Sequence, residues 1–212
     1  MKRALILSAV FLLFSCAAQK TLFYGTDNLQ TFREGRDLEF RNKEESPLTK
    51  EDFPLFKGLD YFQTDNAFRV SAKFTRTPNE DFFQMPTSSG KEKKFVKYGV
   101  LNFKLGEIEH SLNVYQLDPE VLKDIPGYSD LLFIPFKDLT SGKETYGGGR
   151  YIDIRTPTGS EVILDFNLAY NPSCAYGSDR YNCPIPPKEN FLQTKIFAGE
   201  KSYVSPLSGS EH

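Results

Sequence analysis

The sequence predicts a mainly β fold, a single-domain β-sandwich or small barrel with an N-terminal surface helix. Apolar and polar side chains alternate with a period of two in several short segments, and turn residues separate these segments. Helical spacing of apolar residues is confined to one stretch near the N-terminus. The chain of 212 residues is long enough for one domain with a substantial core, which we expect to span residues 26–204.

The first residues have the pattern of an export signal. Two cations precede a largely apolar run, residues 4–14, which is shorter than the roughly 20 residues that a membrane-spanning helix needs. Ser15 and Cys16 then resemble a bacterial lipoprotein cleavage site. We therefore expect a signal peptide over residues 1–15 and acyl chains on Cys16.

Acylation of Cys16 would make the membrane a partner of the protein, with residues 16–25 as the tether. Two or more acyl chains anchor a protein stably. Ala17 stands where some lipoproteins carry the aspartate that retains them in the inner membrane. We therefore expect an outer-membrane anchor, with the domain facing the periplasm of the cell envelope. The alternative is an ordinary signal peptide that is cleaved after Ala17 or Ala18.

The charge of the chain argues against a nucleic-acid partner. The formal net charge is −2, and loss of the two cations of the signal peptide takes it to −4. A nucleic-acid-binding domain shows a basic stripe instead. The lysines of residues 91–97 are interleaved with acidic and apolar residues, which is typical of a solvated strand edge.

One helix is expected between residues 21 and 45. Leu29, Phe32 and Phe40 have helix-compatible spacing, and charged residues flank them. Gly35 in the middle disfavours a helix by about 1 kcal/mol relative to alanine. A Ser-Pro pair after residue 45 ends the segment.

Strands are expected wherever the period of two occurs. The segments are residues 67–75, 94–105, 107–114, 131–136, 151–155, 161–166 and 195–198. We predict a tight hairpin at residues 105–107, and a second hairpin that joins 151–155 to 161–166. Residues 167–192 should form a loop, and the tail over residues 205–212 should be disordered.

His110 is a candidate general base or ligand. It is the single histidine within the predicted domain, and it shares a strand face with Leu112 and Val114. Its side chain should therefore point inward. The alternative is a core imidazole whose hydrogen bonds are satisfied.

Asp153 and Asp165 are candidate catalytic carboxylates. The predicted hairpin puts both on one face, as an acid–base pair for glycoside hydrolysis requires. Arginines alongside them favour a surface ion cluster instead. A hydrolase that combines His110 with these aspartates, or with Cys174, is an alternative function.

Cys174 and Cys183 remain as a pair if Cys16 carries lipid. In an oxidising compartment they should form a disulfide. A thiol nucleophile at Cys174 and a metal site with His110 are the alternatives. That metal site would have three ligands and no paired C-x-x-C spacing, so we expect no metal and no cofactor.

Residues 146–150, Tyr-Gly-Gly-Gly-Arg, form a second candidate site. Three glycines allow positive φ and a close approach to another chain or an anion. Neither a phosphate-binding loop nor a dinucleotide fingerprint surrounds them. A bend that leads into the next strand is the alternative.

Long ordered motifs fill the second half of the chain. They are Thr140–Tyr151, Leu164–Asn167, Ala169–Pro172, Cys174–Tyr176, Cys183-Pro184, Pro186-Pro187, Glu189-Asn190 and Ala198–Glu200. These motifs resemble the domain of unknown function 1684 family, over roughly residues 45–203. The family has no established activity, so the resemblance implies no catalytic residues. It implies that the loops over residues 140–150 and 167–190 form the distinctive part of the domain.

Tyr146, Arg150, Asn167, Tyr170 and Asn171 lie in these loops. Their phenol, guanidinium and amide groups suit a polar ligand that is held by hydrogen bonds and ring stacking. The same groups could equally pin a long irregular loop by satisfying its backbone. We therefore predict a lipid-anchored binding module for a small polar ligand, a glycan fragment or a protein partner. A purely structural envelope protein is a further alternative.

Overall fold

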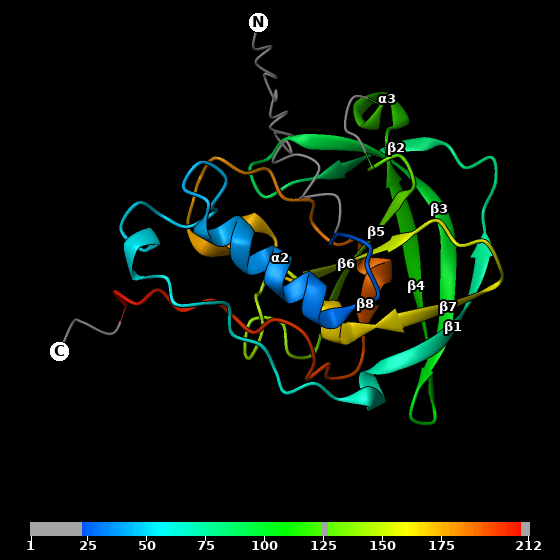
Figure 1. The fold of residues 1–212 in the computed structure, drawn as a ribbon. Coiled ribbons are helices and arrows are strands. Elements are labelled where there is room, and N and C mark those ends of the chain that lie inside the picture. Colours follow the sequence, from blue (N-terminus) through cyan, green and yellow to red (C-terminus); the bar gives the residue numbers. More distant parts are fainter. Residues whose placement is uncertain (1–22, 124–126, 209–212) are drawn as a thin grey trace, which may run out of the picture.

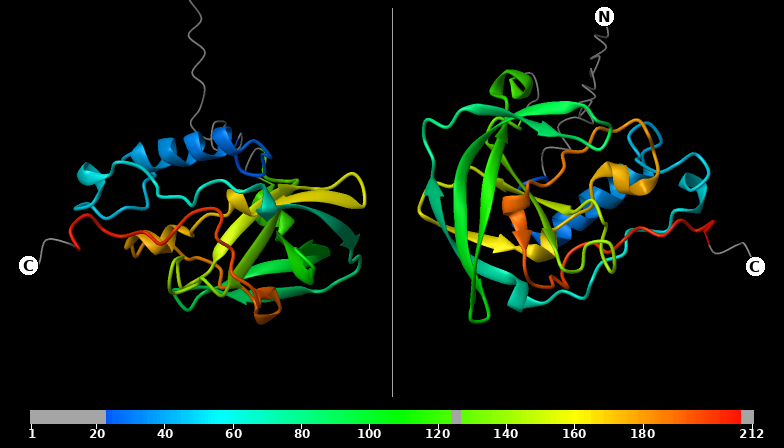
Figure 2. Two further views of the ribbon diagram at one scale, coloured as in Figure 1. Left: turned by 90° about the horizontal axis from the view of Figure 1, so that it is seen from below. Right: turned by 180° about the vertical axis from the view of Figure 1, so that it is seen from behind.

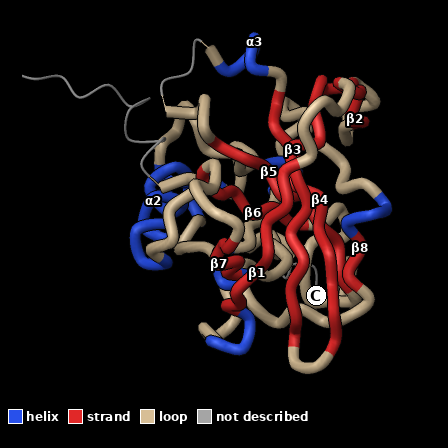
Figure 3. The backbone as a smooth tube through the Cα atoms, turned by 90° about the vertical axis from the view of Figure 1, so that its right-hand side faces the viewer, coloured by secondary structure: helices blue, strands red, loops and turns tan. Residues whose placement is uncertain are grey.

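Eight strands form one sheet that curls into a half-barrel (Figures 1 and 3). The computed structural model describes residues 23–123 and 127–208. The strands run in the order β6-β5-β4-β3-β1-β7, with β2 on β3 and β8 on β5. Their bounds are β1 Arg69–Arg76, β2 Phe82–Pro86, β3 Glu92–Leu105, β4 Ile108–Leu117, β5 Leu131–Asp138, β6 Arg150–Arg155, β7 Glu161–Asp165 and β8 Phe191–Leu192. The predicted mainly β fold is confirmed, and the sheet follows the barrel form of that prediction.

The longest pairing, β3 with β4, is the predicted tight hairpin. Its register ends at Leu105 opposite Ile108, and Gly106 makes the turn with a φ of +59°. One face of this hairpin supplies much of the main core, where alternating side chains turn inward. The fully buried members from these two strands are Leu101, Leu112 and Val114.

The prediction of a second hairpin is wrong. β6 pairs with β5, whereas β7 pairs with β1, so the two strands lie at opposite ends of the strand order. Residues 156–160 join them, and such a short segment spans at most about 20 Å. The curl of the sheet therefore brings its two edges close together. Alternation shows which face of a strand is buried, but not which strand lies beside it.

Helix α2 (Leu29–Arg41) covers the seam between these two edges, with Asn28 as its N-cap. Phe32 packs with Tyr151 of β6 and with Leu168, which follows β7. The predicted helix over 21–45 is thus shorter, and it is partly buried rather than confined to the surface. Gly35 is needed here, because a Cβ at this position would lie 2.4 Å from the ring of Phe23.

The C-terminal segment lies on the same side of the sheet as α2 (Figure 2). Residues 195–198 are not a strand, contrary to the prediction, although Ile196 and Ala198 are buried. A short strand, β8, pairs with β5 instead. Just before it, the Asn190 side chain bonds to both backbone groups of Asn113 on β4, and donates to the carbonyl of Pro135 on β5. One asparagine thus joins β4 and β5 where they separate.

Several predictions concern residues outside the described part of the chain. These are the signal peptide over 1–15, the acylated Cys16, most of the tether over 16–25 and the end of the tail. At the boundary, Phe23 and Tyr24 are buried in the domain. None of the described helices is long and apolar enough to cross a membrane.

Candidate functional site

A cavity of ≈ 410 Å³ opens at the end of the half-barrel opposite the Gly106 turn. It lies where β4 ends and β5 begins, and residues of α2 and of the loop around Cys183 complete its wall. A volume of this size suits a small molecule, and barrel mouths are frequent ligand sites. Aromatic side chains form a large part of its lining, alongside the charged Arg36, Glu39, Lys93 and Asp153; the aromatic residues are Tyr24, Phe95, Tyr128, Phe133, Tyr151, Tyr170 and Tyr181.

Several rings of this wall contact one another in a continuous series. The ring of Tyr151 meets Phe133 edge to face at 4.6 Å, and it meets Tyr170 at 5.7 Å. Tyr24 in turn lies 5.5 Å from Tyr170. The backbones of Tyr151 and Tyr170 also exchange two hydrogen bonds, of 2.9 and 3.0 Å. The aromatic wall is therefore fixed by ring packing and by the backbone.

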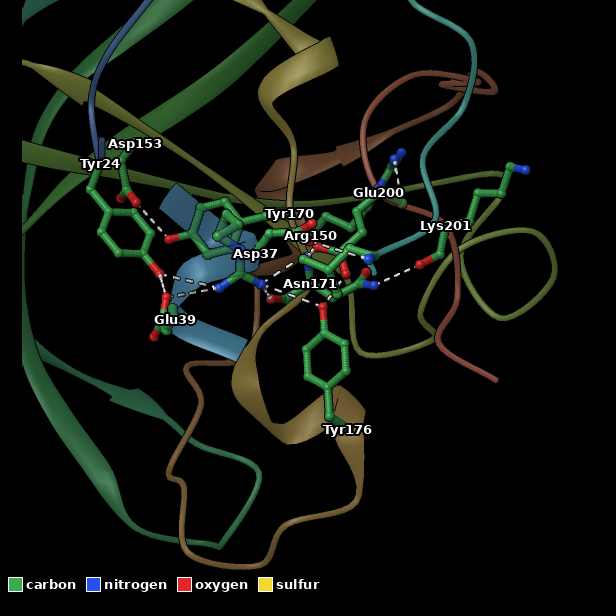
Figure 4. A network of polar contacts seen from close by, with 12 residues as sticks. Tyr24, Asp37, Glu39, Arg150, Asp153, Tyr170, Asn171, Tyr176, Glu200 and Lys201 are labelled. Atoms are coloured by element: carbon green, nitrogen blue, oxygen red, sulfur yellow. Dashed lines mark hydrogen bonds and ion pairs between the residues drawn. The ribbon is translucent and has the colours of Figure 1, made fainter. Parts of the chain in front are cut away.

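Asp153 of β6 places a carboxylate in this aromatic surrounding. Its Oδ2 accepts a hydrogen bond of 2.5 Å from the hydroxyl of Tyr170, and the two side chains point toward each other in Figure 4. Burial raises the pKa of Asp153 to about 6, against the opposing effects of this hydrogen bond and of the charges of Arg36 and Arg155. Burial also raises the pKa of Tyr170 well above its usual value, so its hydroxyl remains a donor.

Arg155, two positions after Asp153, donates hydrogen bonds to other groups. Arg155 donates to the carbonyls of Gly127 and Tyr24, and to the carboxylate of Asp130. No described cation forms an ion pair with Asp153, and its Oδ1 receives no hydrogen bond from residues 23–123 or 127–208. The cavity thus contains a carboxylate oxygen that is available to a ligand.

A buried network behind the cavity ties α2 to the C-terminal segment (Figure 4). Arg36 contacts the hydroxyl of Tyr24 at 3.2 Å and the carboxylate of Glu39 at 3.4 Å. On its other side it lies 3.5 Å from the carboxylate of Glu200, which also accepts a hydrogen bond from Tyr176. Because Tyr24, Arg36 and Glu39 line the cavity, this network fixes one of its walls.

Cys174 and Cys183 form the predicted disulfide, with an S–S distance of 2.07 Å. Cys183 and its neighbours Asn182 and Pro184 line the cavity. The hydroxyl of Tyr151 donates to the carbonyl of Pro184 at 2.5 Å, so the bridged loop is attached to the aromatic wall. The bridge leaves no free thiol at Cys174 for nucleophilic catalysis.

Removal of this disulfide should destabilise the domain. For Cys174→Ser combined with Cys183→Ser, we expect a loss of about 2–3 kcal/mol in the free energy of unfolding, because the bridge closes a short loop. Urea unfolding of the variant and of the wild type measures this difference. The wild type in reductant should behave like the variant, and an unchanged free energy in both cases would contradict the prediction.

Arg150, a predicted ligand contact, lies in the interior. Its guanidinium forms an ion pair of 2.9 Å with Asp138, and both side chains have 0% exposure. It also donates to the carbonyls of Ile196, Ala198 and Glu200. These protein groups engage both terminal nitrogens of the guanidinium, while Nε has no partner among the described residues, and this buried position favours a structural role.

The glycine run before Arg150 makes a bend into β6. Gly149 has a φ of +95°, and a Cβ there would lie 2.6 Å from the carbonyl oxygen of Phe136. Tyr146 is half-buried, and its ring covers Gly148. This geometry supports the alternative of a structural bend, rather than an anion site.

The two predicted asparagines pin the backbone of neighbouring segments. Asn167 exchanges hydrogen bonds with the backbone of Asp65 and donates to Asp165. Asn171 donates to the carbonyl of Lys201 at 2.7 Å. Both asparagines are buried, and neither lines the cavity. Among the five predicted ligand contacts, Tyr170 is the one that lines it.

The predicted catalytic residues are not brought together. His110 lies in an open groove over β1, β3 and β4, where its ring stacks on Phe103 at 5.7 Å. Burial lowers the pKa of His110, and its Nε2 has no partner among the described residues. Asp165 caps the turn after β7 and pairs with Arg69 at 3.3 Å. Asp153 faces the separate aromatic cavity, so the carboxylate pair predicted from the hairpin does not form.

Sequence reasoning missed the contribution of the N-terminal segment to the cavity. Tyr24 was expected in the tether, and Arg36 and Glu39 on a solvated helix face. The spacing of Arg36 and Glu39 relative to Phe32 and Phe40 was the available signal, because it places both charges on the apolar face of the helix. The described residues contain no group of three or more His, Cys, Asp or Glu side chains that could hold a metal ion.

Comparison with known proteins gives a family match. Residues 54–201 match the model described as "Protein of unknown function (DUF1684)". The chain belongs to this family. The resemblance identified from the motifs is therefore confirmed. The matched range contains the strands and the disulfide loop, whereas Tyr24, Arg36 and Glu39 of the cavity precede it.

A solved structure is similar to most of the chain. It is the solution NMR structure of an uncharacterised protein of Haloarcula marismortui, with 34% sequence identity and a TM-score of 0.65. The match covers 87% of this chain and 94% of that chain. None of the curated proteins compared with the chain matches it. These comparisons establish the family and the fold, and they supply no activity.

Proposed function

We propose that the protein binds a small molecule in the aromatic cavity at the end of its half-barrel. The observation that supports this most is Asp153, a carboxylate with one hydrogen-bond partner inside an aromatic enclosure. Such a carboxylate reduces stability, because its charged form is desolvated. Groups of this kind are concentrated at functional sites. The rings, leucines and prolines make most of the lining surface apolar, which favours a ligand with an apolar or aromatic body over a wholly polar one.

We also propose that an acylated Cys16 anchors this binding domain in the cell envelope, at the outer membrane. The support is the export pattern of the first residues. Tyr24 of the cavity wall is eight positions after Cys16, so a tether of that length reaches at most about 28 Å. The cavity would then stay close to the membrane surface.

The hydrolase alternative finds no support in this geometry. His110 lines the open groove and Asp153 lines the separate aromatic cavity, while Cys174 is part of a disulfide. The aromatic cavity itself contains no described histidine and no free cysteine. We therefore propose binding, rather than hydrolysis, as the function of this site.

A neutral aromatic probe tests whether the cavity binds small molecules. We expect 2-phenylethanol to bind the wild type in a calorimetric or NMR titration, because its ring can be buried against the aromatic wall. Asn182→Trp should abolish this binding, since a large ring would fill the cavity from its rim. Glu107→Trp, at the exposed turn beyond the opposite end of the half-barrel, is the matched control and should bind normally.

Two results would contradict the proposal. One is the absence of binding by any aromatic probe at millimolar concentration. The other is equal binding by the Asn182→Trp and Glu107→Trp variants, since the probe would then occupy another surface. Circular dichroism of both variants checks that each one folds.

A further inference from the structure

The open carboxylate oxygen in the cavity restricts the ligand chemistry. Asp153 accepts a hydrogen bond from Tyr170 through Oδ2, while Oδ1 receives none from the described part of the chain. An ionised carboxylate can accept about four hydrogen bonds, so this one is under-used. The missing partners must come from solvent or from a ligand that carries N–H or O–H donors.

The unpaired Asp153 carboxylate favours a cation over a neutral donor. Lys93 also lines the cavity, but it forms no ion pair with Asp153, and burial lowers its pKa. Arg155 engages Asp130 and two backbone carbonyls, and Arg36 is held between Glu39 and Glu200. The charges of both arginines lower the pKa of Asp153, but neither arginine forms an ion pair with it, so this carboxylate has no direct cationic partner among the described residues. A bound cation would supply this counter-ion, and hydrogen bonds to charged partners are stronger than neutral ones.

The aromatic wall fits the same chemistry. Tyr24, Tyr151 and Tyr170 surround the carboxylate side of the cavity, and the hydroxyl of each is bonded to a protein group. Their rings therefore remain as the surfaces that a ligand can contact. Aromatic faces attract ammonium groups, and they also bury an apolar body.

We propose that the cavity selects an organic amine, a ligand whose ammonium group bonds to Asp153 and whose apolar or aromatic body packs against the tyrosine rings. This inference rests on the proposed function, because it names the ligand class of the same site. It assigns Asp153 the role of the selecting residue and the rings the role of a general apolar enclosure. The negative charge of Asp153 then distinguishes amines from neutral molecules of equal size.

A matched pair of probes tests this inference. Phenethylamine and 2-phenylethanol have the same ring and chain, and they differ in the terminal ammonium or hydroxyl group. At pH 7.5 the amine should bind the wild type about tenfold more tightly than the alcohol, as a charge-assisted contact in a partly buried site predicts. Asp153→Asn should remove this preference by weakening the amine about tenfold, with the affinity of the alcohol nearly unchanged. Glu161→Gln, which removes an exposed carboxylate from the groove of His110, should leave both affinities unchanged.

The possible failures are distinct. Equal affinity of the two probes for the wild type would overturn the amine assignment while leaving the binding function intact. A preference that persists in Asp153→Asn would overturn the role of Asp153. Tighter binding of methyl glucoside than of phenethylamine would overturn the assignment in favour of a glycan. If neither aromatic probe binds at all, the proposed function itself fails.

Discussion

Replacing Arg150 by methionine should lower the free energy of unfolding by about 3–5 kcal/mol. Arg150 and Asp138 form an ion pair with no exposed side-chain surface, so the substitution leaves the Asp138 carboxylate buried without its cation. The carbonyls of Ile196 and Ala198 also lose a donor. Urea unfolding monitored by circular dichroism measures the loss.

A double-mutant cycle separates this charge effect from lost packing. Asp138→Asn should be much less harmful in the Arg150→Met background than in the wild type, with a coupling of about 2 kcal/mol or more, because the uncompensated charge is then removed. Lys104→Met is the matched control, since its pair with Glu109 is exposed and should contribute less than about 1 kcal/mol. Equal effects for Lys104→Met and Arg150→Met would show that the buried pair has no special role.

Asp153→Asn should stabilise the protein at pH 8 by roughly 2–3 kcal/mol relative to the wild type. The pKa of Asp153 is about 6 in the folded protein, against 3.8 for an unperturbed aspartate. The folded state therefore binds the proton more tightly than the unfolded state. This contribution to stability is present below pH 4 and is lost as the pH rises through 6.

The test is urea unfolding of both proteins at pH 4 and at pH 8. Asparagine mimics the neutral form and can still accept the hydrogen bond from Tyr170, so the advantage of the variant should be small at pH 4. Glu109→Gln, in which an exposed carboxylate is removed, should show no such difference between the two pH values. An advantage of the same size at both pH values would contradict a desolvated carboxylate.

The two predictions for Asp153→Asn, one on stability and one on ligand preference, are linked. A carboxylate that lowers stability at neutral pH is expected where binding requires it. The variant that gains stability is also the one that we expect to lose the preference for the amine. A structural carboxylate would instead lose stability when it is neutralised, as we expect for Asp138.

Much of the sheet was predictable from local signals. The alternation of apolar residues locates β1, β3, β4 and β5, and the two-residue turn at Gly106 sets the register of the central hairpin. Strand order was not predictable in the same way. The short segment over residues 156–160 looks like a hairpin loop, but it connects the two edges of a curled sheet. Curvature is a property of the whole sheet, and the alternation pattern does not contain it.

The site was harder to predict than the fold, because its parts come from distant segments. The motif loops left two interpretations open, ligand contacts or irregular backbone held by polar groups, and the hydrogen bonds of Asn167 and Arg150 support the second. The disulfide followed from the number of cysteines, but its position at the cavity wall did not. Asp153 and Tyr170 were both candidates, yet nothing local indicates that they form a pair across the seam. The face of α2 that completes the cavity depends on tertiary packing.

The most direct test of the binding site is an NMR titration of the leucine-methyl-labelled protein with phenethylamine. Leu117, Leu122 and Leu131 line the cavity, whereas Leu101 and Leu164 belong to the main core. We expect saturable shifts of the first three methyl signals and little change in the other two. Shifts that spare the cavity leucines, or that appear on all leucines alike, would contradict a binding site at the end of the half-barrel.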